Sequence, residues 1–176
     1  MDELDAGLRI SVTGAVRERA LAAYQRQLTA WNVAMPPVEP LVLDFGLGDF
    51  DHTGLIEYWI ANEAEAGYCG KYLFVFDGQT CPEHRHQVKH ETFLVVQGRC
   101  RMSSGGRSWT MQPGDVFPVP RGQYHAFTGC GPCLLLELST PCEIADNDFR
   151  NPAIPIGRCL SSEDIPDKAV AKPVFH

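Results

Sequence analysis

The chain has 176 residues and a formal net charge of -7, which is enough length for one domain with an ordinary core. The acidic excess argues against a nucleic-acid partner, because such binding depends on Lys and Arg contacts with phosphates. No apolar run approaches the length of a membrane span and the first ten residues carry no basic leader, so we expect neither membrane association nor secretion, and a cytoplasmic location.

Residues 1–40 are predicted to form a helical N-terminal extension. Apolar residues recur at helical intervals from Val16 to Val33, which indicates an amphipathic helix packed on the outside of the domain. The proline-rich segment at 35–40 should end this helix, because proline cannot continue one.

From residue 41 the pattern changes to short strands separated by Gly and Pro. The first candidates are Leu41 to Phe50 and Leu55 to Glu63, and a later hairpin should turn at Gly105-Gly106. The pattern predicts an all-β fold, an antiparallel double-sheet jelly roll, over residues 41–145. Residues 146–176 are predicted to form an irregular tail that packs on the barrel or on a partner subunit.

The seven cysteines are spread through strands and loops, an odd number that fits reduced thiols better than a disulfide framework. Cys130 and Cys133 form the string CGPC found at thioredoxin active sites, but that chemistry needs the first cysteine at a helix N-terminus. Strand patterns flank the string on both sides, so we interpret it as a turn between two strands. A zinc site would need a second CxxC or a His pair beside it, and neither is present.

The most informative stretch, residues 78–98, reads GQTCPEHRHQVKHETFLVVQG. In a strand His84 and His86 point to the same face while Arg85 points away. After a turn, Glu91 re-enters on a neighbouring strand and can approach both imidazoles. The other histidines are out of phase or match no pattern, and we interpret them as solvated: His90, His52 and His176.

A second stretch, GDVFPVPRGQYH from Gly114, places a Pro-Arg-Gly turn before His125. Together the two stretches resemble the paired motifs of the cupin superfamily, with one departure where Gly129 replaces the closing Asn. The resemblance implies a cupin double-stranded β-helix, a jelly-roll barrel, in which four side chains bind one divalent metal: His84, His86, Glu91 and His125. Three neutral imidazoles and one carboxylate suit Mn, Fe, Zn, Co or Ni.

Two further polar residues are predicted to face the barrel interior. Lys71 shares a strand face with Leu73 and Val75, and Glu137 lies in the apolar strand CLLLELS. A carboxylate buried alone would be costly, so Glu137 should have a partner such as Lys71, Arg85 or the metal-bound ligand. The alternative is that Glu137 lies at a strand end and points to water.

Several strings are more particular than the general cupin pattern: GLGDF from Gly46, YCGK from Tyr68, GQTCPEHRH from Gly78, ETF from Glu91 and LELS from Leu136. They resemble the D-lyxose ketol-isomerase family of cupins between about Leu41 and Pro155. The resemblance implies a manganese-dependent aldose–ketose isomerase that acts as a homodimer and converts D-lyxose to D-xylulose, often with D-mannose to D-fructose. The 15 residues between Gly98 and Gly114 are fewer than that family has there, so we expect this loop to affect sugar preference.

In such an enzyme Lys71 and Glu137 are candidate catalytic residues. Glu137 could carry the C2 proton of an open-chain aldose to C1 through an enediol, while Lys71 holds Glu137 ionised or moves the O1/O2 proton. A hydride shift would use the same metal ligands. Candidates for contact with sugar hydroxyls, or for a stacking face, are Glu83, Gln79, Tyr124, Trp59 and Tyr58. The rival functions are another metal-dependent cupin enzyme, such as a dioxygenase, and a non-catalytic sugar-binding cupin.

Overall fold

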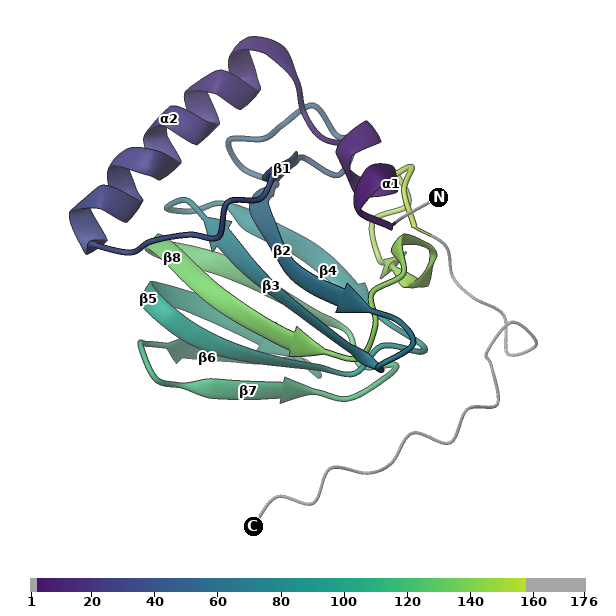
Figure 1. Cartoon of the computed structure of the whole chain (residues 1–176). Helices are drawn as coiled ribbons and strands as arrows, with labels where there is room; N and C mark the ends of the chain where they lie inside the picture. Colours follow the sequence, from purple (N-terminus) through teal and green to yellow (C-terminus); the bar gives the residue numbers. More distant parts are fainter. Residues whose placement is uncertain (1–2, 158–176) are drawn as a thin grey trace.

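A computed structural model describes residues 3–157, whose strands form one curled sheet with α2 across its outside (Figure 1). The helices are α1 (Glu3–Arg9), α2 (Gly14–Trp31) and the 3-10 helix η1 (Ile144–Asp146). The strands are β1 (Leu41–Leu43), β2 (Leu55–Glu63), β3 (Tyr68–Val75), β4 (Thr80–Arg85), β5 (Glu91–Ser104), β6 (Arg107–Met111), β7 (Val116–Val119), β8 (His125–Ser139) and β9 (Asp148–Phe149).

Two long strands, β5 and β8, form the centre of the sheet. They pair antiparallel from Glu91 opposite Ser139 to Ser104 opposite His125. The other edge of β8 is divided between β3 and β4, and the other edge of β5 between β7 and β6. Because the two ends of each long strand join different neighbours, the sheet curls around an interior (Figure 1). This arrangement confirms the predicted all-β cupin barrel with an N-terminal helix.

Alternation along the strands separates an inner apolar cluster from an outer one. On β3, Leu73 and Val75 belong to the inner cluster, whereas Phe74 between them belongs to the outer cluster. The inner cluster also receives Phe93 and Met102 from β5, on the opposite part of the sheet. Removal of these side chains from water is the main favourable term that holds the curled sheet closed.

The helix α2 covers the outer cluster. Its buried residues recur every four positions: Ala20, Tyr24 and Leu28. The ring of Tyr24 meets the ring of Phe74 edge-on, with centroids 4.8 Å apart. The helix ends at Trp31, two residues earlier than predicted, because Asn32 adopts the left-handed conformation (φ 55°). Within residues 3–157 no helix has the length and apolar character needed to cross a membrane.

The strand predicted from Leu41 to Phe50 is too long, because β1 ends at Leu43. Phe45 and Gly46 have φ angles of 57° and 77°, in the left-handed region, and turn the chain out of the strand. The Asp44 carboxylate stabilises this turn by accepting the backbone N–H groups of Gly46 and Gly48.

The CGPC string is a bulge within β8, so the prediction of a turn between two strands is wrong. Gly98 pairs with Cys133 and Cys100 with Gly129, which leaves residues 130–132 opposite Arg99 alone. A side chain at position 98 would collide with the carbonyl oxygen of Pro132, at 1.9 Å from the position of Cβ. No helix follows the string, and the six cysteines within residues 3–157 are free thiols.

The described part of the tail lies against the barrel. Strand β9 pairs with β4, which places the Phe149 ring 5.3 Å from the ring of His84. The carboxylate of Glu3 in α1 accepts the backbone N–H of Ile144 at 2.7 Å, so α1 lies at this same end of the barrel (Figure 1). The rest of the tail lies outside the described residues, together with the predicted free thiol Cys159 and the predicted surface residue His176.

Candidate metal centre

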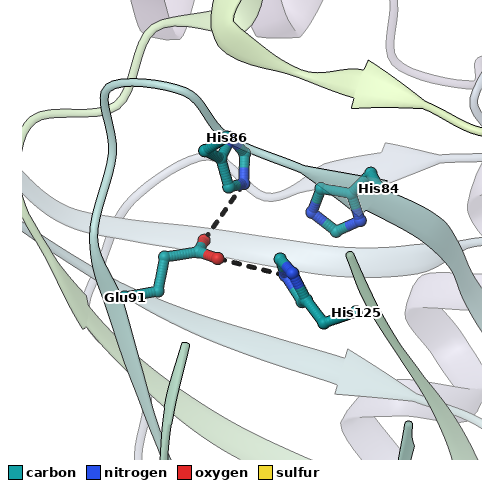
Figure 2. A group of neighbouring side chains, drawn as sticks. All are labelled: His84, His86, Glu91 and His125. Atoms are coloured by element: carbon teal, nitrogen blue, oxygen red, sulfur yellow. Dashed lines mark ion pairs between the residues drawn. The ribbon is translucent and has the colours of Figure 1, made fainter. Parts of the chain in front are cut away.

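Four side chains converge inside the barrel from three neighbouring segments (Figure 2). His84 lies on β4 directly opposite His125, the first residue of β8. His86 follows β4, and Glu91 is the first residue of β5. The four are between 1% and 7% exposed, and their candidate ligand atoms lie within 4.8 Å of one another. The structure therefore brings together all four residues predicted as metal ligands.

Backbone carbonyls fix the orientation of the three imidazoles. The Nδ1 atoms of His84, His86 and His125 lie 2.8, 3.0 and 3.2 Å from the carbonyl oxygens of Pro82, Asp146 and Gln123 respectively. A carbonyl can only accept, so each Nδ1 carries a proton, and in the neutral imidazole the free lone pair is then on Nε2. Metal-binding histidines are commonly held in this way.

The atoms that face one another in this cluster lack hydrogen-bond partners. Nε2 of His86 and of His125 lie 3.3 and 3.0 Å from the two carboxylate oxygens of Glu91 (Figure 2). Yet both Nε2 atoms and Glu91 Oε2 are buried without a properly aligned hydrogen bond. Buried polar atoms normally find a partner. Lone pairs that converge on one point without bonding each other fit a divalent cation among them.

The protonation states favour metal binding as well. Burial, reinforced by the nearby His125 and His86, lowers the pKa of His84 well below its usual value. Burial also lowers the pKa of His86. Burial alone would raise the pKa of Glu91, but the combined effect of His86, Lys89 and His125 holds it well below the ordinary value. His84 and His86 are thus neutral imidazoles beside an ionised Glu91, which suits a divalent cation such as Mn, Fe, Zn, Co or Ni.

A chain of alternating charges continues from Glu91 across the interior. Lys89 Nζ lies 2.5 Å from Glu91 Oε1 and 3.0 Å from Glu137 Oε1. Lys71 Nζ lies 3.5 Å from Glu137 Oε2 and 3.8 Å from Glu57 Oε2. Glu137 therefore lies between two lysines, and the prediction that it has Lys71 as a partner is confirmed. The alternative partner Arg85 instead pairs with Asp148.

The two lysines keep Glu137 ionised. Burial acts to raise the pKa of its carboxyl, but Lys71 and Lys89 outweigh burial and lower the pKa below the ordinary value. Burial would lower the pKa of both lysines, yet the surrounding anionic groups raise it above the usual value. One oxygen of Glu137, Oε1, also accepts a hydrogen bond from Ser139 Oγ at 3.0 Å. Its other oxygen, Oε2, lies 3.5 Å from Lys71 Nζ and accepts no hydrogen bond from the described residues.

Most of the residues predicted to contact a sugar lie elsewhere. The predicted sugar contact of Gln79 is wrong, because its amide group donates to the Phe50 carbonyl and accepts the backbone N–H of Phe76. The predicted sugar contact of Tyr58 is also wrong, because its ring stacks on Tyr24 beneath α2.

The remaining three predicted sugar contacts lie on both sides of the barrel wall. Glu83 is exposed and pairs with Arg150, and the Tyr124 hydroxyl donates to Asp148 at 3.2 Å beside Arg85 and Arg150. Trp59 alone faces the interior, with its ring centroid 5.1 Å from Lys71 Nζ.

Three residues of the site were missed from the sequence. Lys89 lies in the predicted turn between His86 and Glu91, and Asp146 is the first residue of the predicted tail. The Asp146 carboxylate accepts the backbone N–H groups of residues 87, 88 and 89 at 2.8 to 3.2 Å, which fixes the loop between His86 and Glu91. Glu57 had a usable signal, because it has the same parity on β2 as the inward-facing Leu55 and Trp59.

Two small cavities meet beside the charged chain. The inner cavity, about 40 Å³, borders His84, Lys89, Glu91 and Glu137. The outer cavity, about 50 Å³, extends from Lys71 toward α1 and the described tail. Four residues line both cavities and mark their junction: Phe45, Glu57, Lys71 and Asn147.

Comparison with known proteins gives consistent results. The family model described as D-lyxose isomerase matches residues 40–98, and the one described as cupin domain matches residues 74–139. A D-lyxose/D-mannose isomerase of Thermosediminibacter oceani is 30% identical over 84% of this chain and 95% of its own length. A D-lyxose ketol-isomerase of Cohnella laeviribosi is 30% identical over 64% of this chain and 76% of its own. The structure of Cellulomonas parahominis L-ribose isomerase with L-ribose, 18% identical, superposes with a TM-score of 0.66 over 83% of this chain and 96% of that one, which shows a shared fold.

Proposed function

We propose that this chain, which belongs to the D-lyxose isomerase family of the cupin superfamily and is therefore a sugar isomerase, is a manganese-dependent enzyme that converts D-lyxose to D-xylulose and also D-mannose to D-fructose. One observation carries the proposal: His84, His86, Glu91 and His125 form a buried set beside the ionised Glu137, and three atoms of this set, His86 Nε2, His125 Nε2 and Glu91 Oε2, lack hydrogen-bond partners among the described residues. A metal site and a base then border the same inner cavity.

The four clustered side chains are the proposed ligands. When bound, a divalent cation would polarise the sugar carbonyl and acidify the proton on C2. The carbonyls that hold each Nδ1 keep the imidazoles aimed at one point, which supports this assignment.

Glu137 is the proposed base that moves the proton. Within residues 3–157 its Oε2 accepts no hydrogen bond and lies 3.5 Å from Lys71 Nζ, so this is the oxygen proposed to accept the C2 proton and return it to C1 through an enediol. Lys71 and Lys89 stabilise the ionised carboxylate before it accepts the proton. Lys71, near both Glu137 and the junction of the cavities, can also donate to a sugar oxygen.

The decisive experiment combines metal analysis with a sugar screen. Metal-free protein is reloaded with Mn, Co, Fe, Zn or Ni and incubated without oxygen with a panel of pentoses and hexoses, and ketoses are measured by chromatography. Anaerobic ketose formation that is fastest with Mn, and with D-lyxose among the fully hydroxylated sugars, supports the proposal. Absence of any ketose, together with oxygen consumption when the same mixtures are exposed to air, would replace the proposal with a dioxygenase function.

Isotope transfer tests the role of Glu137. In deuterated water, a proton carried by Glu137 exchanges with solvent, so deuterium should enter the ketose at C1. Glu137→Gln should lower turnover about 100-fold or more, whereas the matched variant Glu83→Gln, which changes an exposed glutamate on β4, should retain it. A product formed without solvent deuterium would favour a hydride shift and refute the proton route through Glu137.

We further propose a cytoplasmic homodimer. Leu138 on β8 and Ile60 on β2 are exposed large apolar residues on the two strands that flank β3, and they form a candidate contact for a second copy. The six free thiols within the described residues fit a reducing compartment. Light scattering of the purified protein tests the dimer, and Leu138→Lys should shift it toward monomer.

A further inference from the structure

The outer cavity has polar groups at one end only. The polar side chains that line it, Glu57, Lys71 and Asn147, all line the inner cavity too. The residues that line the outer cavity alone are glycine, cysteine, tryptophan and aliphatic or aromatic residues, among them Ile10, Leu43, Phe149 and Ile156. The charged groups therefore lie at the junction, and the wall beyond them is apolar.

Most polar atoms at this junction are already engaged. The indole N–H of Trp59 donates to Glu57 Oε2 at 2.8 Å, and the Asn147 amide nitrogen donates to the Ile144 carbonyl at 2.8 Å. Two oxygens, Glu57 Oε1 and Asn147 Oδ1, accept no hydrogen bond from any residue between 3 and 157. Glu57 Oε1 can therefore accept one hydroxyl group at the boundary between the two cavities.

The proposed chemistry sets the direction in which a sugar would lie. Two of the proposed metal ligands, His84 and Glu91, border the inner cavity together with Glu137, so C1 and C2 must be there. The rest of the carbon chain then passes Lys71 and Glu57, and its last carbon reaches the outer cavity. At about 50 Å³ this cavity exceeds the roughly 10–15 Å³ that a cavity needs to hold one water, so it can hold a small terminal group.

A terminal hydroxyl would be poorly accommodated there. A hydroxyl moved from water into an apolar space without a partner loses its hydrogen bonds, whereas a methyl group gains from the same transfer. Both effects favour a sugar whose last carbon is a methyl group over one whose last carbon bears a hydroxyl.

From this division of the cavity, and on the basis of the proposed isomerase function, we infer that the preferred substrate is a terminally deoxygenated aldose. Its far end is a methyl group packed between Ile10, Leu43 and Ile156, and the hydroxyl of a preceding carbon binds Glu57 Oε1. D-Lyxose and D-mannose are then slower substrates of the same site.

The test compares 6-deoxy-D-mannose with D-mannose on the metal-loaded enzyme. The two sugars close to the same six-membered ring, so the supply of open-chain sugar is matched. We expect kcat/KM to be at least about tenfold higher for the deoxy sugar. Ile156→Asn and Ile10→Asn, which place an amide in the wall from two different segments, should each lower this ratio at least about threefold. The control Val116→Asn, at a residue 59% exposed on β7, should leave it unchanged.

A binding measurement separates this inference from the proposed reaction. Calorimetry with 6-deoxy-D-mannitol and D-mannitol, which cannot be isomerised, should give tighter binding of the deoxy alditol. Turnover with equal kcat/KM for both aldoses, or a ratio that neither wall variant changes, would overturn the inference and leave the isomerase intact. If no aldose is turned over but the deoxy alditol still binds more tightly, the cavity assignment is supported and the proposed isomerase function is refuted. If no aldose is turned over and the two alditols bind equally, both the inference and the proposed function are refuted.

Discussion

Replacement of Lys89 by methionine should destabilise the metal-free protein strongly. Lys89 Nζ contacts two buried carboxylates, at 2.5 Å from Glu91 and 3.0 Å from Glu137. With an effective dielectric constant of about 20, each contact contributes an attraction of about 5 to 7 kcal/mol, most of which offsets the cost of removing the charges from water. Methionine keeps the apolar stem and removes the charge, so the carboxylates lose their common partner.

The free energy of unfolding should fall by about 3 to 5 kcal/mol, because a buried charge left without its partner costs about that much. The lower end is expected, since Glu137 keeps Lys71 at 3.5 Å. At about 2 to 4 °C per kcal/mol for a chain of this size, Tm should fall by at least about 6 °C. Urea denaturation in the presence of a chelator measures the effect.

Arg19→Met is the matched control. Arg19 pairs with Asp51 at 2.9 Å, but their side chains are 62% and 67% exposed, so the loss should stay below about 1 kcal/mol. A loss below about 1 kcal/mol for Lys89→Met as well would refute the account of the interior as a chain of mutually dependent charges.

The remaining predictions concern the metal centre. His84→Ala or His125→Ala should abolish metal retention while the far-UV circular dichroism of the barrel persists; full metal content in either variant would refute the ligand assignment. Glu137→Gln should lower kcat by about 100-fold or more with KM and metal content nearly unchanged, and a drop confined to KM would contradict its role as a base. Asp146→Ala, which frees the loop behind His86, should weaken metal binding about 10- to 100-fold by calorimetry, and unaltered affinity would show that the loop needs no such support. Metal at 100 times its Kd should stabilise the metal-free chain by about 2.7 kcal/mol, measured as a rise in Tm, and no rise would mean that the metal does not favour the folded state.

Strand parity explains why much of the site could be predicted. Side chains alternate between the two faces of a strand, so one buried face fixes which side chains point into the barrel. His84, His86 and Glu91 are therefore buried in the interior as predicted, and so are Lys71 and Glu137. The spacing of glycines and prolines likewise predicted the all-β barrel, and the helical period predicted the buried stripe of α2.

The residues that were missed depend on contacts that no period encodes. Lys89 lies in the loop before β5 and Asp146 at the end of η1, and their burial follows only from how these two segments pack against each other. The end of β1 depends on the left-handed backbone of Phe45, which is uncommon for a residue with a side chain. Gln79 was assigned to a sugar because an amide can serve either a ligand or the backbone, and here it serves the backbone of Phe50 and Phe76.

The central claim is tested most directly by measuring isomerase activity on D-lyxose while Mn is titrated into the metal-free chain. We predict that ketose formation rises in proportion to bound metal and stops rising at one ion per chain. Activity that is already complete in the chelated protein, or that does not follow occupancy of the site formed by His84, His86, Glu91 and His125, would contradict it.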